Sequence, residues 1–421
     1  MNGQRVKLSG VARAAVICVL LSATASPGQE SVRMSLAGAE ASEERRKAAG
    51  ALADSNLRLG PSAWSFDAGF GLEANDNLRA TPVEREQDLV FRPEVDARMR
   101  LPLSEVNTIA LAIGVGYDLY ASHSEYDRPF LTPGSEVSFD VYILDLWLNA
   151  HVRCSIVENA FLDPTVTGIG DYERLDNAAG LSAVWDLNKV IPSLRYDHET
   201  FIALGGLHGQ PNGQAETFSG SVGYALKPGL RGGFEAGGAL IHYDATLANP
   251  AFTDGTEWNV GPFFDTQLTE HLRARVSAGY SSFSPQSGPG AQQGGAFSGF
   301  YLQVGGTHRI NQYLDYTLSG GRSLNFGFYG GMLDQFFARL EAAWHLFRHS
   351  ALSTMLSYQH GTQLGPGAEV FDWLNPGISL NRAFGARLTA TLSYQYYWRG
   401  SDYSGRGYSA NVLMASLVWR L

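Results

Sequence analysis

The stretch from Asp88 to Leu101, DLVFRPEVDARMRL, constrains the fold of this 421-residue chain more than any other. Every second residue from Asp88 to Arg100 is charged except Val90, whereas the intervening positions from Leu89 onward carry no charge. Successive side chains of a β-strand point to opposite faces. The pattern therefore predicts a strand with one ionic face and one apolar face.

This predicted strand is longer than most strands of soluble proteins. At about 3.3 Å per residue it would reach roughly 45 Å, whereas a tilted strand crosses a bilayer with roughly 9 to 11 residues. In a soluble β-sandwich the apolar face would pack on a dry core. In a membrane barrel it would face lipid, and the ionic face would line a water-filled lumen.

Composition favours a membrane barrel over a soluble β-sandwich but does not decide between them. Beyond residue 25 no apolar run approaches the roughly 18 residues that a membrane helix requires. The 48 glycines, 22 phenylalanines and 19 tyrosines suit a barrel with aromatic girdles, but they would also suit a secreted β-sandwich. The net charge of −10 argues against a nucleic-acid partner.

The N-terminus has the layout of a secretory signal peptide. A basic region (residues 5–13) precedes an apolar core (residues 14–21) and a small-residue cleavage site that ends at Ala25. Cleavage after Ala25 would leave Cys154 as the single cysteine, so no intramolecular disulfide can form. We therefore expect an exported chain whose stability does not depend on disulfides.

Three parts are expected along the chain. The segment after the signal peptide mixes acidic and basic residues with alanines and shows no strand pattern, so we expect a periplasmic segment that is either a short helix or disordered. Strand patterning begins near Trp64 and continues to Leu421 without a second domain. The expected parts are a signal peptide (1–25), a periplasmic N-terminal segment (26–60) and an outer-membrane β-barrel (61–421).

Period-two segments recur along the barrel region, and the connections between them alternate between short and long. That alternation is typical of outer-membrane barrels, with short periplasmic turns and longer extracellular loops. We expect an all-β, transmembrane, antiparallel up-and-down barrel of about 18 strands. Sixteen is the alternative, because residues 135–157 could form two strands joined near Asp145 or one bulged strand. The clearest repeats are residues 107–120, 272–281, 336–346, 387–398 and 408–421.

The C-terminal segment resembles the strand that marks outer-membrane barrels for insertion. In Tyr408–Leu421 the apolar positions share one parity up to the last residue, although that residue is Leu421 and not an aromatic residue. The expected partners are therefore the barrel-assembly machinery and the lipid bilayer of the outer membrane. The sequence does not define the oligomeric state.

Several short motifs resemble those of a known family. Residues 70–77 (FGLEANDN), followed by a loop and the charged strand, are similar to the opening of the beta-barrel porin type 2 family. Residues 176–180 (DNAAG), 185–188 (WDLN) and 196–198 (YDH) are also similar to that family. The resemblance implies an outer-membrane barrel, and some relatives accompany exopolysaccharide gene clusters. It implies no catalytic residues.

The ionic parity of the strands supplies the candidate functional residues. Charged side chains on the lipid face would be strongly destabilising, so we expect them to face the lumen. There they could set a transverse field that selects solutes, or they could form ion pairs that only fill and stiffen the wall. The predicted pore-lining residues are Arg92, Glu94, Asp96, Arg98, Arg100, Arg273, Arg275, Arg339, Glu341 and Arg387.

Other chemistry has little support in the sequence. His151 and Ser155 share a strand parity, but about 13 Å separates positions four residues apart, which is too far for a serine–histidine pair. No spacing indicates a metal site, a cofactor or a nucleotide, so none is expected. Aromatic residues on the strands are interpreted as membrane girdles: Trp147, Trp344, Trp398 and Trp419.

The sequence thus predicts an outer-membrane channel for small hydrophilic solutes, and not an enzyme. Infolded loops would restrict solute size, and charged lumen residues would select among solutes. Two alternatives remain open: a conduit for exopolysaccharide export that works beside periplasmic partners, and a structural barrel with a plugged lumen that does not conduct.

Overall fold

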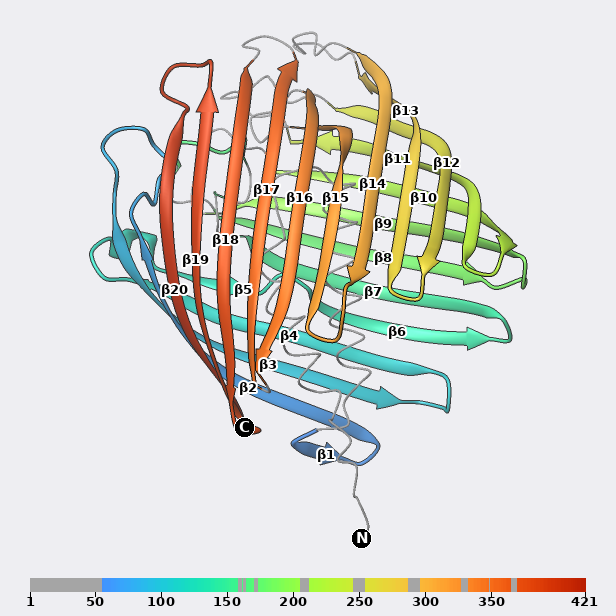
Figure 1. Ribbon diagram of the computed structural model, residues 1–421, viewed down its shortest axis with the longest axis horizontal. Helices are drawn as coiled ribbons and strands as arrows, with labels where there is room; N and C mark the ends of the chain where they lie inside the picture. Colours follow the sequence, from blue (N-terminus) through green and yellow to red (C-terminus); the bar gives the residue numbers. More distant parts are fainter. Residues whose placement is uncertain are drawn as a thin grey trace.

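The strands form one closed antiparallel barrel (Figure 1). The computed structural model describes residues 55–157, 161, 164–169, 173–204, 212–244, 254–286, 296–326, 332–347, 349–364 and 369–421. The ring closes because β2 pairs with both β3 and the last strand, β20. Within the described residues, no helix is long and apolar enough to cross a membrane.

Eighteen strands make up the ring, although 20 strands are numbered in the sheet. β1 pairs only with β2 and lies outside the ring, and β5 and β6 both pair with β4 and share one place, so 20 − 2 = 18. The predicted fold class and the preferred strand number are confirmed. The first strands are β1 (Leu57–Leu59), β2 (Ser62–Asn75), β3 (Asp88–Pro102), β4 (Thr108–Tyr120), β5 (Arg128–Leu131), β6 (Ser135–Ile143), β7 (Leu146–Val157), β8 (Arg174–Trp185) and β9 (Val190–Ala203).

The second half of the ring continues with strands of 13 to 16 residues. Their length matches the tilted strands of membrane barrels, with the surplus extending beyond the lipid. They are β10 (Gly213–Lys227), β11 (Leu230–Tyr243), β12 (Gly255–Thr269), β13 (Leu272–Pro285), β14 (Phe297–Arg309), β15 (Leu314–Phe326), β16 (Met332–Phe347), β17 (Ser350–Leu364), β18 (Val370–Phe384), β19 (Leu388–Ser401) and β20 (Tyr408–Arg420).

The ambiguous region 135–157 forms two strands, β6 and β7. Their two-residue turn consists of Leu144 and Asp145, and Leu144 adopts a φ of 55°. Leucine is unusual in this left-handed conformation, which Gly or Asn adopts at much lower cost. Two further strands lie where none was expected: β1 in the N-terminal segment, and β5 inside the connection between β4 and β6. Residues 1–54, with the expected signal peptide and most of the expected periplasmic segment, lie outside the described residues.

The connections divide the barrel into two ends. At one end, here called the turn end, consecutive strands are joined by two to five residues; at the other, the loop end, they are joined by five to sixteen. β2 begins and β20 ends at the turn end, where Figure 1 places the C-terminus. The predicted alternation of short and long connections is therefore present around the whole ring.

The outer face of the barrel is apolar over most of its height. Large side chains point outward from strands all around the ring, with exposed fractions of 69% for Leu194, 67% for Phe234 and 74% for Phe300. A soluble protein would not expose so continuous an apolar surface. This face therefore suits the hydrocarbon region of a bilayer.

Polar groups reappear on the outer face toward the loop end. On β9 and β10, His198 Nδ1 and Tyr196 Oη contact the Glu216 carboxylate at 2.8 and 2.6 Å. On β17 and β18, His360 and Tyr358 hold Asp372 in the same arrangement, at 2.9 and 2.7 Å. The tyrosine ring lies nearer the middle of the barrel in both cases, so these groups mark where the apolar band ends.

Three of the four tryptophans predicted to form girdles do lie on the outer face. Trp344, Trp398 and Trp419 are between 40% and 51% exposed, on strands whose alternate residues face inward. Trp147 differs, because its indole Nε1 donates to Asp140 Oδ1 at 3.0 Å on the inner face of β6 and β7. The girdle interpretation of Trp147 is therefore wrong, since a strand parity cannot be assigned before the turn that starts the strand is known.

Candidate functional site in the barrel lumen

The inner face of β3 carries the charges that the sequence placed there. Arg92 lies between two neighbouring strands: Nη1 is 3.0 Å from Glu73 Oε2 on β2, and Nε and Nη2 donate to Asp118 on β4 at 2.7 and 2.8 Å. Arg98 pairs with Asp67 on β2, which Arg420 Nε also approaches at 3.6 Å. These arginines are therefore held against the wall by carboxylates.

The two carboxylates of β3 lie beside glycines of the neighbouring strands. Glu94 is opposite Gly69 and Asp96 is opposite Gly114 in the strand register. A β-carbon on Gly69 would lie 2.4 Å from Glu94 Cγ, and one on Gly114 would lie 2.4 Å from Asp96 Oδ1. The glycines thus leave the space in which Glu94 and Asp96 lie along the wall; Arg100, the last predicted residue of β3, is also partly buried.

A second ionic cluster lies on β7 and β9 around Asp197. His151 Nε2 and Arg153 Nη2 both lie 2.7 Å from Asp197 Oδ1, and Arg195 Nε donates to Asp197 Oδ2 at 2.6 Å. The Asp197 side chain is only 1% exposed. His151 is thus paired with a carboxylate, and Asn149 Oδ1 lies 2.9 Å from its other ring nitrogen.

Sequence reasoning missed Asp197 as the centre of this cluster. In the sequence, Asp197 was noted only as part of the family-like motif Tyr196 to His198. Its partners Arg153 and His151 lie 44 and 46 residues away on another strand, so the sequence does not show that they meet. Only the register of β7, β8 and β9 brings them together: Gly180 on β8 is opposite both His151 and Asp197. Without a side chain, Gly180 lets the cluster bridge over the intervening strand.

The predicted residues on later strands lie in two further groups. Arg275 Nη2 is 2.6 Å from Glu235 Oε2, and its guanidinium carbon is 4.6 Å from the centre of the Phe263 ring. Arg273 is exposed two residues earlier on the same inner face. On β16, Arg339 Nε is 2.6 Å from Glu341 Oε1.

Arg387 is the exception among the predicted residues. It lies in the exposed turn of residues 385–387 and not on the wall of a strand. The alternating pattern of β19 begins at Leu388, and the residue before it ends the turn. Arg387 therefore belongs to the rim of the turn end.

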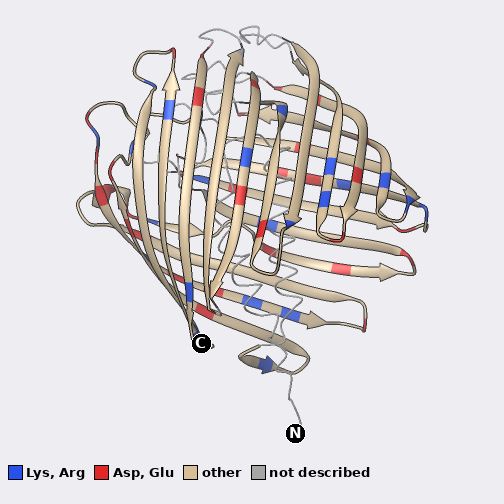
Figure 2. Cartoon of the chain, viewed as in Figure 1, with Lys and Arg blue, Asp and Glu red and all other residues tan. Residues whose placement is uncertain are grey.

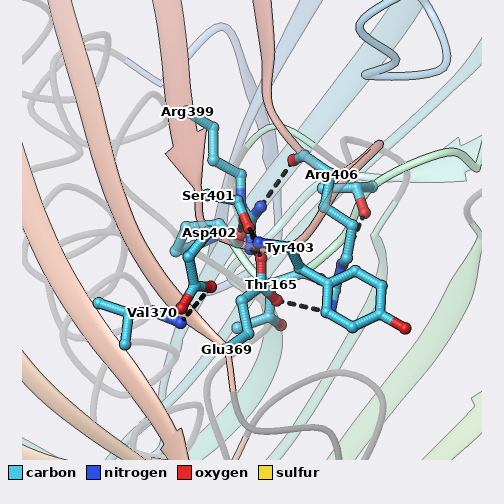
Figure 3. Close-up of polar contacts among 10 residues, drawn as sticks. Thr165, Glu369, Val370, Arg399, Ser401, Asp402, Tyr403 and Arg406 are labelled. Atoms are coloured by element: carbon cyan, nitrogen blue, oxygen red, sulfur yellow. Dashed lines mark hydrogen bonds and ion pairs between the residues drawn. The ribbon is translucent and has the colours of Figure 1, made fainter.

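A buried ion network lies at the loop end, where Figure 3 shows its side chains. Glu369 precedes β18 directly and binds Arg399 of β19 (Nη2 to Oε1, 2.6 Å) and Arg406 of the β19–β20 loop (Nη1 to Oε2, 2.5 Å). The side chains of Arg399 and Glu369 are 0% and 1% exposed. We call Glu369, Arg399 and Arg406 the latch.

The latch holds part of the β7–β8 connection. Arg399 Nε donates to the Pro164 carbonyl at 2.5 Å, and Arg406 Nη2 donates to the Thr165 carbonyl at 2.9 Å. Arg406 Nε also reaches Thr167 Oγ1 at 3.3 Å. Burying ionic groups is favourable only when they are paired and hydrogen-bonded, and here loop carbonyls complete the shell of the two arginines.

This connection reaches far around the inside of the ring. Four strands (β6, β4, β3 and β2) separate β7 from β20, an arc of roughly 24 Å at about 4.8 Å per strand. Phe161 packs on the inward-facing Tyr397 with ring centres 4.9 Å apart, and Gly168 N donates to the Arg79 carbonyl of the β2–β3 loop at 2.9 Å. The two loops therefore lie against the inner wall and narrow the loop end of the lumen.

An apolar cluster anchors these loops beside the latch. It includes Ala80 and Phe161 from the loops, both at most 3% exposed. Their partners on the wall are inward-facing residues of β16 and β18–β20. These are Leu333, Phe371, Trp373, Tyr397, Tyr408, Ala410 and Val412.

The inner faces of β17 and β18 contrast with those of β3 and β9. Their inward-facing residues include Ser353, Ser357, Gln359, Asn375 and Asn381, each less than 9% exposed, and none is charged. Figure 2 shows charged positions spread over the strands of the far wall and sparse along β17–β20. The lumen is thus lined by an ionic wall, defined here as the inner faces of β2–β9, and a neutral wall, defined as those of β17 and β18.

Two residues of the β4–β6 loop, outside the spanning strands, have shifted pKa values. Burial, and then the hydrogen bond to Glu86, raise the pKa of Tyr126 to about 12. The hydrogen bond between His123 Nδ1 and Asp88, 2.9 Å long, raises the pKa of His123. The first contact ties the β4–β6 loop to the β2–β3 loop, and the second ties it to the start of β3.

The described residues of the lumen offer ionic and hydrogen-bonding groups. Among the described residues, no three His, Cys, Asp or Glu side chains are placed to hold a metal ion. His151 pairs with Asp197, and Ser155 lies opposite Asp176 of β8 in the strand register. The arrangement can guide or repel charged solutes.

Comparisons with known proteins find similarity in structure alone. No protein-family model matches the sequence, and no curated protein is significantly similar to it. Acinetobacter baumannii OccAB3 superposes with a TM-score of 0.51 at 11% identity, over 86% of this chain and 100% of that one. Pseudomonas aeruginosa OccK5 (OpdH) gives 0.50 at 11% identity, over 86% and 99%.

A third similar structure is P. aeruginosa OccK2 (OpdF) in complex with glucuronate. It gives a TM-score of 0.50 at 10% identity, over 86% of this chain and 99% of that one. At such low identity the likeness concerns the fold alone, and that fold is a closed β-barrel. The β-barrel fold that the family resemblance implies is thereby confirmed. Membership of the beta-barrel porin type 2 family stays a prediction.

Proposed function

We propose that the chain is an outer-membrane channel through which small hydrophilic solutes cross. The observation that carries the proposal is a closed ring of 18 strands with an apolar outer face and a charged, polar lumen. Membership of the beta-barrel porin type 2 family, suggested by the motifs in residues 70–77 and 176–198, belongs to the same proposal.

Size selection would come from the loops at the loop end. The latch and the apolar cluster hold residues 161 and 164–169 against the inner wall, far from the strands that flank them in the chain. A solute must pass beside this segment, so its position sets the width of the path. Releasing the latch should widen that path.

Charge selection would come from the ionic wall. Arg92 and Arg98 on this wall, and Arg275 on β13, are paired with carboxylates, so the lumen presents an ordered array of both signs at these positions. Polar solutes that pass through such an array exchange water for oriented charges. The ion pairing left open by the sequence is thus present at these three arginines, and it is compatible with selection.

The proposal is tested by swelling of liposomes that contain refolded protein, with sugars of increasing size. Wild type should admit small sugars and exclude large ones, and Glu369→Gln should raise the size limit, because Arg399 and Arg406 lose their counter-ion. Glu125→Gln, at an exposed loop-end site, is the matched control. Folded wild-type protein that admits no solute would contradict the proposal.

A further inference from the structure

A recess lies at the turn end of the barrel, between the β8–β9 turn and β13. Its volume is about 720 Å³, and its charged lining consists of Lys189, Lys227, Arg231, Arg273 and Asp265. Four cations and one carboxylate give a formal charge of 4 − 1 = +3 in a chain whose net charge is −10. The recess is therefore positively charged, although the protein as a whole is negatively charged.

Three of these cations differ from the other basic residues of the lumen. Arg231 binds Asp265 at 2.8 Å, as Arg92 and Arg275 bind their own carboxylates. The side chains of Lys189, Lys227 and Arg273 make no ion pair or hydrogen bond with any residue that the structure describes, and all three are exposed. Their charges are available to a solute.

The position of these groups favours an anion with more than one charge. Lys227 ends β10 opposite Leu230 of β11, and Arg273 is the second residue of β13, on the inward-facing parity of that strand; both line the recess. A single carboxylate would neutralise one cation and leave two facing each other, whereas a phosphate monoester carries close to two charges and offers three acceptor oxygens. Arginine and lysine are the usual partners of such groups.

We propose that this recess binds a small solute with two or more negative charges, such as a phosphorylated sugar, as it leaves or enters the lumen at the turn end. The inference rests on the proposed channel function and adds the solute class. Ile191, which shares the inward-facing parity of Arg195 and Asp197, would contact the uncharged part of the solute. Lys189, Lys227 and Arg273 would hold the anionic group.

The test uses single-channel recordings of the full protein in a planar bilayer, with glucose 6-phosphate as the probe and glucose and glucuronate as comparisons. Glucose 6-phosphate should interrupt the current, glucuronate should do so more weakly, and glucose should not. Lys227→Gln with Arg273→Gln should shorten the interruptions roughly tenfold, because each cation supplies a charge-assisted hydrogen bond. Raising salt from about 0.1 M to about 1 M should also shorten them, because the screening length falls from about 10 to about 3 Å.

Arg387→Gln is the matched control, since this arginine lies at the same end of the barrel but does not line the recess. Interruptions that are equal in wild type and in the double variant, or absent from a conducting wild type, would overturn the inference. If the protein conducts no current, the channel proposal fails separately. Titration calorimetry of glucose 6-phosphate into detergent-solubilised protein then tests whether the recess binds this solute. Equal heats of binding in wild type and the double variant would reject the inference.

Discussion

β9 and β18 lie nine strands apart in a ring of 18, and their inner faces are built in different ways. β9 carries Arg195, Asp197 and Glu199, the last two at most 5% exposed. β18 carries Asn375 and Asn381 at the corresponding buried positions, with no charge along its inner face. One wall is held by ion pairs between strands and the other by neutral hydrogen bonds and small side chains.

The difference between these two inner faces shows how a lumen can be both charged and stable. A buried ion costs little only when its counter-ion is fixed nearby, so the ionic wall depends on a register that aligns partners on different strands. The neutral wall has no such requirement, and each of its residues can be replaced with a smaller loss. The two walls should therefore respond very differently to single substitutions.

The largest contrast is expected between Asp197→Ala and Asn375→Ala. Removing Asp197 leaves His151, Arg153 and Arg195 without their shared counter-ion in a buried site, which should cost about 3–5 kcal/mol of unfolding free energy. Asn375 makes one hydrogen bond, to the Tyr396 carbonyl at 3.1 Å, so its loss should cost about 1 kcal/mol. Urea unfolding in detergent measures both, and similar losses would remove the distinction between the walls.

A smaller effect is expected for Arg92→Gln. Glu73 and Asp118 would lose their cation, and the Asp118 side chain is 0% exposed, so we expect a loss of about 2–3 kcal/mol. The double variant Arg92→Gln with Asp118→Asn should recover part of it, because Asp118, the more deeply buried of the two carboxylates, is then no longer a charge without its cation. The same unfolding assay applies; a double variant no more stable than the single one would show that the charge is not the cause.

A glycine within the ionic cluster should tolerate a side chain less well than a glycine outside both walls. A β-carbon at Gly180 would lie 2.5 Å from the Tyr196 carbonyl oxygen and 2.3 Å from Asp197 Oδ1, whereas one at Gly305 would meet nothing within 4 Å. Gly180→Ala should therefore cost about 1–3 kcal/mol, and Gly305→Ala should be neutral or stabilise by up to about 1 kcal/mol. Melting temperatures of the two variants check this, and an equal decrease for both would contradict it.

The smallest effect is a pH dependence at the β4–β6 loop. Because Asp88 raises the folded-state pKa of His123 above 6.5, the contact stabilises fully below pH 6.5 and is lost as the pH rises through the raised value. NMR titration of the His123 ring should give a midpoint above 6.5 that decreases in Asp88→Asn. A midpoint that is unchanged in the variant would remove the role of the ion pair.

The sequence predicted the ionic wall better than the neutral one. Charged residues at alternate positions of β3 have one stable orientation in a membrane barrel, so the strand and its two faces followed from a single stretch. The choice of a barrel depended on the alternating short and long connections along the whole chain. Serines and asparagines such as Ser357 and Asn375 are tolerated on either face of a strand, so the alternating pattern did not predict that they face the lumen. The strand number was left between 16 and 18 because the turn at Leu144 lacks the glycine or asparagine that usually marks such a turn.

The candidate site was predicted only where it depends on local spacing. Arg92, Arg98 and Arg275 were placed in the lumen, but their partners come from other strands, and the cluster around Asp197 depends on a register that the sequence does not display. The latch was missed for the same reason: Arg399 and Pro164 are 235 residues apart. Arg387 was misplaced because an alternating pattern does not show where a strand gives way to a turn.

The central claim, a conducting lumen controlled by its ionic wall, is tested most directly by single-channel recording across a salt gradient. The account predicts discrete current steps for wild type, and a reversal potential that becomes more cation-selective in Arg98→Gln, because Asp67 is then left with Arg420 alone. Folded protein without current steps, or a reversal potential identical in the two proteins, would contradict it.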